Sequence, residues 1–233
     1  HIHSAHSGDC MTPDRVQVVA AIGRGLEEIC FTEHYDIDFP VSPYVDYEAD
    51  LPSYCAAIQA LREEFAGRIT IKTGIEKGMQ LHVFDLLQER MQGYTFDYVL
   101  ASRHVFDREN GIIFPQRSKH KYERGELFRI YLQKLIECVK VYDDFNCISH
   151  LTYHSRYMGF DPPEMVYTDA PEELDALFKL LIAKQQGIEV NTSSYAKLGF
   201  CMPDHSIVKR FHELGGEVIT VGMKLLYEPS HCP

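Results

Sequence analysis

Apolar positions along the chain change repeatedly between helical spacing and short runs rich in β-branched residues. The short runs predict six strands, at residues 28–31, 69–75, 97–101, 147–149, 188–190 and 217–221. Helical spacing predicts helices that alternate with them, at residues 14–25, 47–65, 82–92, 123–141, 171–186 and 204–214. Strands that alternate with helices usually run parallel and are joined by right-handed crossovers, so the pattern predicts an α/β fold. It leaves open whether the sheet closes into a barrel or stays open and doubly wound.

Two stretches between these elements are long, polar and interrupted by proline. They cover residues 104–122 and 151–170. Because long loops in a compact domain are often functional, we expect them to be candidate lids over a substrate. The chain shows no linker or repeat, and residues 1–233 are therefore expected to form a single domain.

Composition narrows the class of protein. With 45% hydrophobic positions among 233 residues, the chain can bury one sizeable core. The formal net charge of −11 disfavours broad nucleic-acid binding, because an acidic surface repels a phosphate backbone. An apolar run long enough for a membrane helix and a signal peptide are both lacking in this sequence, so a soluble, cytoplasmic protein without a membrane partner is expected. The seven cysteines lack CxxC spacing, which favours reduced thiols.

Histidines and carboxylates gather where predicted strands end. Four of the six strands run into a residue that could bind a metal, and two histidines at i and i+2 open the chain on one face of an extended segment. In chain order the candidates are His1, His3, Asp9, His34, Glu76, His104 and His150. Since the carboxyl ends of parallel strands meet at one edge, the sequence predicts a metal site there.

This set of donors favours particular ions and a particular reaction. Imidazoles that share one carboxylate suit two or three ions of zinc, iron or manganese. Two ions about 3.5 to 4 Å apart can hold a phosphoryl oxygen and activate a bridging water, which indicates hydrolysis of a phosphate ester by a metal-bound hydroxide. Cations in loops near the strand ends could bind the phosphate or be solvated surface charges. They are Arg103, Arg117, Lys119, Arg156 and Lys197.

Other reactive residues have simpler interpretations. Four histidines in or beside predicted helices are expected to be solvated or packed in the core, namely His82, His120, His205 and His212. His6 and His154 could support a ligand or be exposed. Asp36 and Asp38 could form the aspartate pair of an aspartyl-phosphate phosphatase, but Phe39 and Pro40 follow where such sites favour a hydroxyl or small residue.

An ordered series of short motifs covers nearly the whole chain. In chain order they are His1-x-His3, Asp9, Thr32-Glu33-His34, Gly74-x-Glu76, Ser102-x-His104, Ser149-His150 and Glu189-Val-Asn191-Thr. With this series the chain resembles the polymerase and histidinol-phosphatase (PHP) superfamily, and most of all its monofunctional histidinol-phosphatases. The resemblance implies a distorted (β/α)7 barrel with the metal site at the C-terminal ends of the strands.

The resemblance also implies roles for individual residues. His1, His3 and Glu76 would hold one ion, and Glu76 would bridge to a second. His104 and His150 would complete the second ion, while Asp9 and His34 would hold a third. Arg156 and Lys197 match the residues that bind the substrate's phosphate. The implied reaction is hydrolysis of L-histidinol phosphate to L-histidinol and inorganic phosphate in L-histidine biosynthesis, by a metal-bridging hydroxide.

The last motif departs from the family pattern. Family members carry Ser-Asp-Ala-His after the final strand, whereas residues 223–227 of this chain read Met-Lys-Leu-Leu-Tyr. Without that Asp and His, the second ion would keep its ligands and the first and third would each lose one, unless His231 substitutes. The chain also begins inside the first motif and ends before the family's final helix. Two alternatives therefore stay open: a phosphoesterase for another small phosphate ester or nucleotide, and an inactive metal-binding domain.

Overall fold

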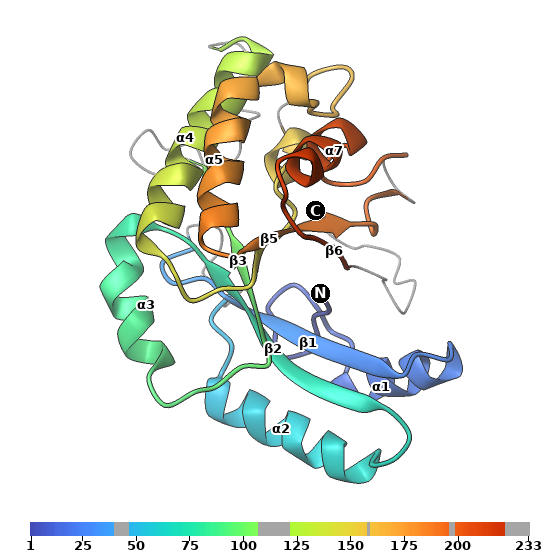
Figure 1. The fold of residues 1–233 in the computed structure, drawn as a ribbon. Helices are drawn as coiled ribbons and strands as arrows, with labels where there is room; N and C mark the ends of the chain where they lie inside the picture. The colour runs from blue at the N-terminus through green and yellow to red at the C-terminus, as the bar shows by residue number, and fades with distance from the viewer. Residues whose placement is uncertain (40–46, 107–121, 158, 196–198, 222–233) are drawn as a thin grey trace.

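Six parallel strands form one sheet in the computed structural model, which describes residues 1–39, 47–106, 122–157, 159–195 and 199–221 (Figure 1). The strands are β1 (Glu28–Tyr35), β2 (Thr70–Gly78), β3 (Tyr98–Ser102), β4 (Cys147–Ile148), β5 (Gly187–Asn191) and β6 (Val218–Val221). The helices are α1 (Asp14–Gly23), α2 (Leu51–Glu64), α3 (Phe84–Met91), α4 (Arg124–Val141), α5 (Pro171–Ala183) and α7 (His205–Glu213). Three short 3₁₀ segments are η1 (Leu81–Val83), η3 (Tyr153–Tyr157) and η4 (Tyr167–Asp169).

The order of strands across the sheet follows their order along the chain. Each strand pairs in parallel with the next, from β1 to β6. A doubly wound sheet would reverse its strand order at a switch point, whereas a barrel keeps the order unbroken. The predicted α/β class is therefore confirmed, and the strand order is that of a barrel.

The N-terminal segment lies between the two ends of this sheet. The Thr32 amide on β1 donates a hydrogen bond to the Ile2 carbonyl, at 2.9 Å. On the other side, His1 Nδ1 lies 2.7 Å from Glu189 Oε1 on β5. In Figure 1 the N-terminus accordingly sits between β1 and the β5–β6 end of the sheet. Within the described ranges no backbone ladder joins this segment to β6, and the contact with β5 is between side chains.

Element positions agree with the sequence prediction, and several boundaries differ for physical reasons. The sequence predicts a helix over 47–65, but α2 begins at Leu51 because the backbone before it is bonded to β1: the Ala49 amide donates to the His34 carbonyl at 3.1 Å. The predicted strands 28–31 and 69–75 continue to Tyr35 and Gly78. Polar residues continue these strands because the sheet interior holds the polar cluster described below.

The predicted loop over residues 151–170 contains the two 3₁₀ segments η3 and η4. Most of the other predicted loop, residues 104–122, lies outside the described residues, so a role as a lid stays a prediction. Helix α5 ends at Ala183 rather than at residue 186, because Gln185 has a positive φ of 57°.

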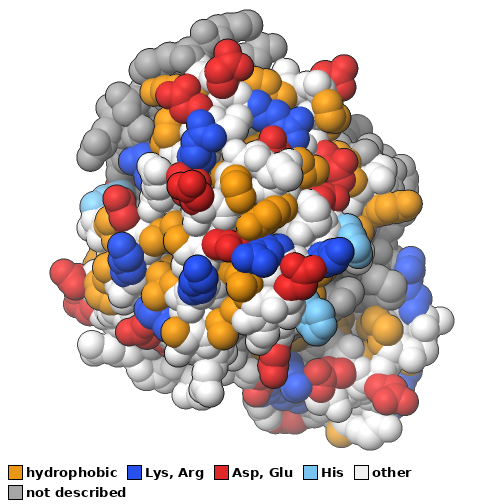
Figure 2. All heavy atoms as spheres, turned by 45° about the horizontal axis from the view of Figure 1, so that its top comes forward, with side chains coloured by type: hydrophobic (Ala, Val, Ile, Leu, Met, Phe, Trp, Pro, Cys, Tyr) orange, Lys and Arg blue, Asp and Glu red, His pale blue; other side chains and the backbone are white. Residues whose placement is uncertain are grey.

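Burial of apolar side chains stabilises the packing of α4 beside α5. Leu127 and Leu135 of α4 and Leu177 of α5 are fully buried, and α4 packs beside α5 in Figure 1. Each such leucine contributes about 1.5–3 kcal/mol by leaving water. On the face drawn in Figure 2, acidic, basic and hydrophobic side chains are intermixed. Exposed ion pairs such as Lys72–Glu28 are screened by water and add little, so the core dominates stability.

Two further observations concern the class of protein. None of the helices in the described ranges is long and apolar enough to cross a bilayer. Six cysteines in those ranges are free thiols: Cys10, Cys30, Cys55, Cys138, Cys147 and Cys201.

Gly74 allows three strands to approach closely beside the polar cluster. A Cβ at this position would lie 2.8 Å from the backbone carbonyl oxygens of Phe31 and Tyr98. The buried hydroxyl of Tyr54 also donates to the Gly74 carbonyl, at 2.8 Å. We expect Gly74→Ala to destabilise the fold by about 1–3 kcal/mol, because backbone atoms cannot move aside. Urea unfolding measures the loss.

Gly23 provides the matched control for that substitution. It lies in the last turn of α1, and no atom lies within 4 Å of the position of its Cβ. Gly23→Ala should therefore be neutral or stabilise by up to about 1 kcal/mol, through helix propensity. Equal destabilisation by both substitutions would contradict the steric argument.

Candidate metal centre

A single buried carboxylate, that of Glu76, is the centre of the candidate site. Glu76 lies on β2 opposite His34 on β1 and has no exposed surface. Its Oε1 lies 2.8 Å from His150 Nε2 and its Oε2 lies 3.2 Å from His1 Nε2. Three further imidazoles lie close to it: His3 at 3.5 Å, His34 at 3.3 Å and His104 at 3.3 Å. Five imidazoles from distant parts of the chain thus surround one carboxylate.

The candidate ligand atoms fall into overlapping groups in which every atom lies within 4.8 Å of the others. The groups are His1–His3–Glu76, Glu76–His104–His150, His3–Asp9–His34 and His34–Asp36–His104. The structure therefore brings all seven sequence-predicted side chains into one cluster. The first two groups are the ligand sets that the family resemblance implies, and the third adds His3 to the implied pair.

The hydrogen bonds of the histidine rings on the side away from Glu76 indicate whether a cation fits between the rings. His1 Nδ1 contacts the carboxylate of Glu189 at 2.7 Å, so it carries a proton and donates it. Its Nε2 then carries a second proton or offers a lone pair, and this atom lies 3.0 Å from Nε2 of His3. Two lone pairs so close to each other and to a carboxylate repel unless positive charge lies among them. Imidazole nitrogens and carboxylate oxygens are ligands of zinc, iron and manganese, so the residues fit such ions.

A serine fixes the orientation of His3 in the same way. Ser7 Oγ donates its only proton to Glu33 and therefore accepts from its other neighbours. One of these is His3 Nδ1, at 3.2 Å, so His3 carries its proton on Nδ1 and points Nε2 into the cluster. Glu33 also accepts from the Ser4 amide at 3.0 Å. This buried carboxylate thus holds the N-terminal turn in place.

The pKa shifts show that the cluster demands positive charge. Burial opposes ionisation of Glu76, but His1, then His34 and His104, outweigh it and hold the pKa of that carboxyl well below its usual range. Burial likewise opposes a charge on His104, yet Asp36 and then Glu76 raise its pKa to about 9. Burial lowers the pKa of His3 to about 3. The negative charge of Glu76 is balanced either by protons on some of the rings or by bound cations.

Glu189 supports the site from β5. One of its oxygens contacts His1, and the other accepts the backbone amide of His150. His150 has a positive φ of 26°, a conformation that a non-glycine residue rarely adopts. The bond from its amide to a buried carboxylate offsets this strain, so Glu189 orients two candidate ligands at once.

Asp36 is the main functional candidate that the sequence interpretation missed. Its carboxylate lies 2.7 Å from His104 Nδ1 and 3.0 Å from His34 Nδ1. Asp38 instead pairs with His82 at 2.9 Å on the exposed side, so the two aspartates do not act as one aspartyl-phosphate pair. The signal was present in the sequence, because Asp36 follows His34 at the i+2 spacing that places strand residues on one face.

The predicted phosphate-binding cations have different surroundings. Arg156 is exposed in η3, and its guanidinium lies 5.6 Å from the ring centre of Tyr153. Tyr153 in turn lies 4.9 Å from the ring of His150, so Arg156 stands at the rim of the cluster. Arg103 turns away, because its guanidinium contacts Cys138 Sγ and the Phe106 carbonyl. These contacts do not favour a phosphate-binding role for Arg103. Lys197, Arg117 and Lys119 lie outside the described residues.

The histidines outside the candidate set have structural or solvated positions. His205 and His212 are exposed, as predicted, and His120 lies outside the described residues. His154 is buried and donates from Nε2 to the Arg103 carbonyl at 2.8 Å, which supports the backbone next to His104. His6 lies 3.6 Å from Asp14 and away from Glu76's contacts.

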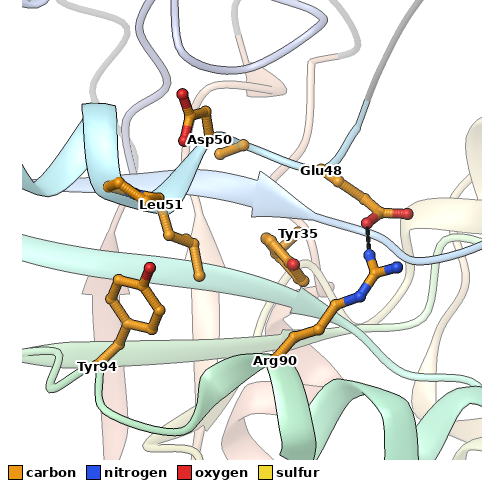
Figure 3. Close-up of a pocket in the computed structure, with 8 residues that line it drawn as sticks. Tyr35, Glu48, Asp50, Leu51, Arg90 and Tyr94 are labelled. Carbon is orange, nitrogen blue, oxygen red and sulfur yellow. Dashed lines mark hydrogen bonds and ion pairs between the residues drawn. The ribbon is translucent and has the colours of Figure 1, made fainter.

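A surface pocket beside the end of β1 is separate from the cluster (Figure 3). Tyr35, Leu51 and Tyr94 line it, and Arg90 across it is paired with Glu48. None of the seven candidate ligands lines this pocket. Its arginine already has a carboxylate partner, so the pocket offers no free cation to a substrate.

Imidazoles surround a buried carboxylate at the carboxyl ends of parallel strands, and these strands are in barrel order. This arrangement defines a candidate polynuclear metal centre in an α/β domain. The chain belongs to the PHP domain family, whose model matches residues 1–193. The histidinol-phosphatase of Lactococcus lactis is 31% identical over 228 residues, which cover 95% of this chain and 81% of that protein.

Two solved structures share the fold. Histidinol phosphate phosphatase from Lactococcus lactis, complexed with zinc, L-histidinol and phosphate, aligns with a TM-score of 0.80 at 29% identity and covers 94% of this chain and 82% of its own. A structure from Listeria monocytogenes aligns with a TM-score of 0.74, covering 98% of this chain and 97% of its own. At 15% identity this similarity supports a shared fold alone. The fold class that the resemblance implies is therefore confirmed.

Zinc should stabilise the folded chain through Glu76, because the carboxylate is common to two of the ligand groups. Binding at 100 times the dissociation constant adds about 2.7 kcal/mol, which corresponds to roughly 5–10 °C in Tm for a chain of this size. We expect Glu76→Gln to lose most of this zinc-dependent rise, measured by differential scanning fluorimetry with and without chelator.

The exposed Glu64, which pairs with Arg15 at the surface, supplies the control for that experiment. Glu64→Gln should keep the full zinc-dependent rise. A full rise in Glu76→Gln would show that the ions bind elsewhere.

Proposed function

We propose that this chain is a histidinol-phosphatase, which hydrolyses L-histidinol phosphate to L-histidinol and inorganic phosphate as a cytoplasmic step of L-histidine biosynthesis. The observation that carries the proposal is the Glu76 cluster, in a chain 31% identical to a relative of that name. The complex of the Lactococcus lactis protein with zinc, L-histidinol and phosphate supports both the metal and the substrate class.

Three of the four groups of candidate ligands support two or three divalent ions, with zinc the first choice. His1, His3 and Glu76 would hold one ion, Glu76 with His104 and His150 a second, and Asp9 with His34 a third. Bound divalent ions polarise a phosphoryl oxygen and lower the pKa of water. His1 and His3 present Nε2 to the cluster, and the contacts of their Nδ1 atoms with Glu189 and Ser7 fix them in that orientation.

Arg156 is the proposed residue that binds the phosphate from the protein side. The 3₁₀ turn η3 follows His150 directly, since the Tyr153 amide donates to the His150 carbonyl at 2.7 Å. Tyr153 therefore lies against the His150 ring, and Arg156 lies over Tyr153 and Tyr157. A guanidinium that lies over aromatic rings keeps N–H groups available for two phosphate oxygens. Lys197 is proposed as a second phosphate contact.

A substrate panel tests the proposal. The zinc-loaded protein should release phosphate from L-histidinol phosphate with a higher kcat/KM than from p-nitrophenyl phosphate, simple sugar phosphates or nucleotides. Preference for a nucleotide or another ester would favour the alternative phosphoesterase. Absence of release from protein shown by elemental analysis to hold zinc would favour the inactive metal-binding domain.

Loss of the Arg156 guanidinium should weaken phosphate binding. A hydrogen bond between charged groups contributes about 1.5–3 kcal/mol, so we expect Arg156→Ala to lower kcat/KM by about 10- to 100-fold and to weaken inhibition by inorganic phosphate. Metal content should not change. Steady-state kinetics and elemental analysis measure these quantities.

Arg68 is the matched control, because its guanidinium also lies over an aromatic ring, Phe65, at 5.2 Å. It precedes β2 and so lies at the end of the sheet opposite the cluster. Arg68→Ala should leave kcat/KM within about twofold. An unchanged phosphate inhibition constant in Arg156→Ala would refute the assignment.

A further inference from the structure

The carboxylate of Asp36 lies between two candidate metal ligands that belong to different groups. Asp36 is 3% exposed and stands just beyond the end of β1. Its Oδ1 lies 2.7 Å from His104 Nδ1, and its Oδ2 lies 3.0 Å from His34 Nδ1. Each oxygen thus serves one imidazole.

We propose that Asp36 is a positioning residue that couples two of the metal positions, by holding His34 and His104 together in the tautomer that directs Nε2 toward an ion. This inference rests on the proposed metal-dependent function, although it concerns assembly of the metal centre rather than the reaction. Asp36 accepts from both Nδ1–H groups, and it touches neither substrate nor ion.

The Nε2 atoms of both rings face other candidate ligands, and His34 Nδ1 lies 3.3 Å from Glu76 Oε2 as well as close to Asp36. His104 Nε2 lies 3.3 Å from Glu76 Oε1, in the group that contains His150. His34 Nε2 lies 3.5 Å from Asp9 Oδ2, in the group that contains His3. A neutral imidazole that donates through Nδ1 has only Nε2 left to bind a metal. One carboxylate therefore sets the ligand atom at two separate positions.

Gly78, which has no side chain, leaves space for the Asp36 carboxylate. A Cβ at Gly78, on β2, would lie 2.0 Å from Asp36 Oδ1, so any larger residue there would displace the aspartate. The rings of His34 and His104 meet edge to face, with centroids 5.0 Å apart. Because both rings and the carboxylate are enclosed, a rotation of either imidazole would disturb the other.

A competing arrangement would make Asp36 a ligand itself, since His34, Asp36 and His104 also form a group of close donor atoms. An ion bound there would take both Nδ1 lone pairs and put a proton on each Nε2. Those protons would face Asp9 and Glu76, and the other groups would lose a ligand. The two arrangements differ in which nitrogen is protonated, so they can be distinguished.

The test uses Asp36→Asn, zinc titration and ¹⁵N-histidine NMR. Asparagine can accept from only one Nδ1–H, and its NH₂ group would oppose the other. We expect the affinity for the more weakly bound zinc ions to fall by about 10- to 100-fold, measured by chelator competition. In the zinc-loaded wild type, ¹⁵N shifts should show Nδ1 protonated and Nε2 bound to metal for both His34 and His104, and the variant should lose one of these Nδ1–H signals.

Asp38→Asn is the control, because Asp38 lies two residues further along and pairs with the exposed His82. It should change neither zinc affinity nor the signals of His34 and His104. A folded Asp36→Asn with wild-type zinc affinity would overturn the proposal, as would wild-type spectra with metal on Nδ1. The wild-type spectrum decides the tautomers even if Asp36→Asn does not fold. These measurements need no substrate, so a chain that binds zinc as expected but lacks phosphatase activity would refute the proposed function alone.

Discussion

The charge of Glu76 is the constraint around which the polar interior of this protein is organised. A carboxylate without exposed surface is costly unless positive charge lies beside it, and five imidazoles converge there from the N-terminal segment and from β1, β3 and β4. These rings need acceptors on their outer sides, which Glu189, Asp36 and Ser7 supply. The strands extend past their apolar stretches because they carry this network.

The sequence predicted the alternation of strands and helices, the edge of the sheet that carries the site and its seven candidate ligands, because histidines and carboxylates follow the predicted strands. The strand order came from the structure. The sequence did not reveal the supporting residues. Asp36 was considered as half of an aspartate pair, and only the structure shows that it faces His34 and His104 while Asp38 faces His82. Tyr153 carried no signal, since its place against His150 depends on a 3₁₀ turn. The orientation of Arg103 also depends on contacts with α4 that no local pattern encodes.

The family pattern and the departure from it concern different parts of the chain. All seven candidate ligands and their supporting carboxylates lie within residues 1–193, the part that the PHP model matches. The replaced motif at residues 223–227 lies outside the described residues. Within the described residues, the contacts around Glu76 and His1 are made by side chains up to Glu189. Metal content and turnover of this chain therefore each have to be measured.

The contact between His1 and Glu189 joins residues 188 positions apart. Local helices and neighbouring strands can form early in folding, but a pairing of such separation closes a very long loop and is expected late. During synthesis, His1 leaves the ribosome long before Glu189 exists. His1 therefore remains without this partner until most of the domain has been synthesised. We expect the contacts around His1 to be completed late in folding.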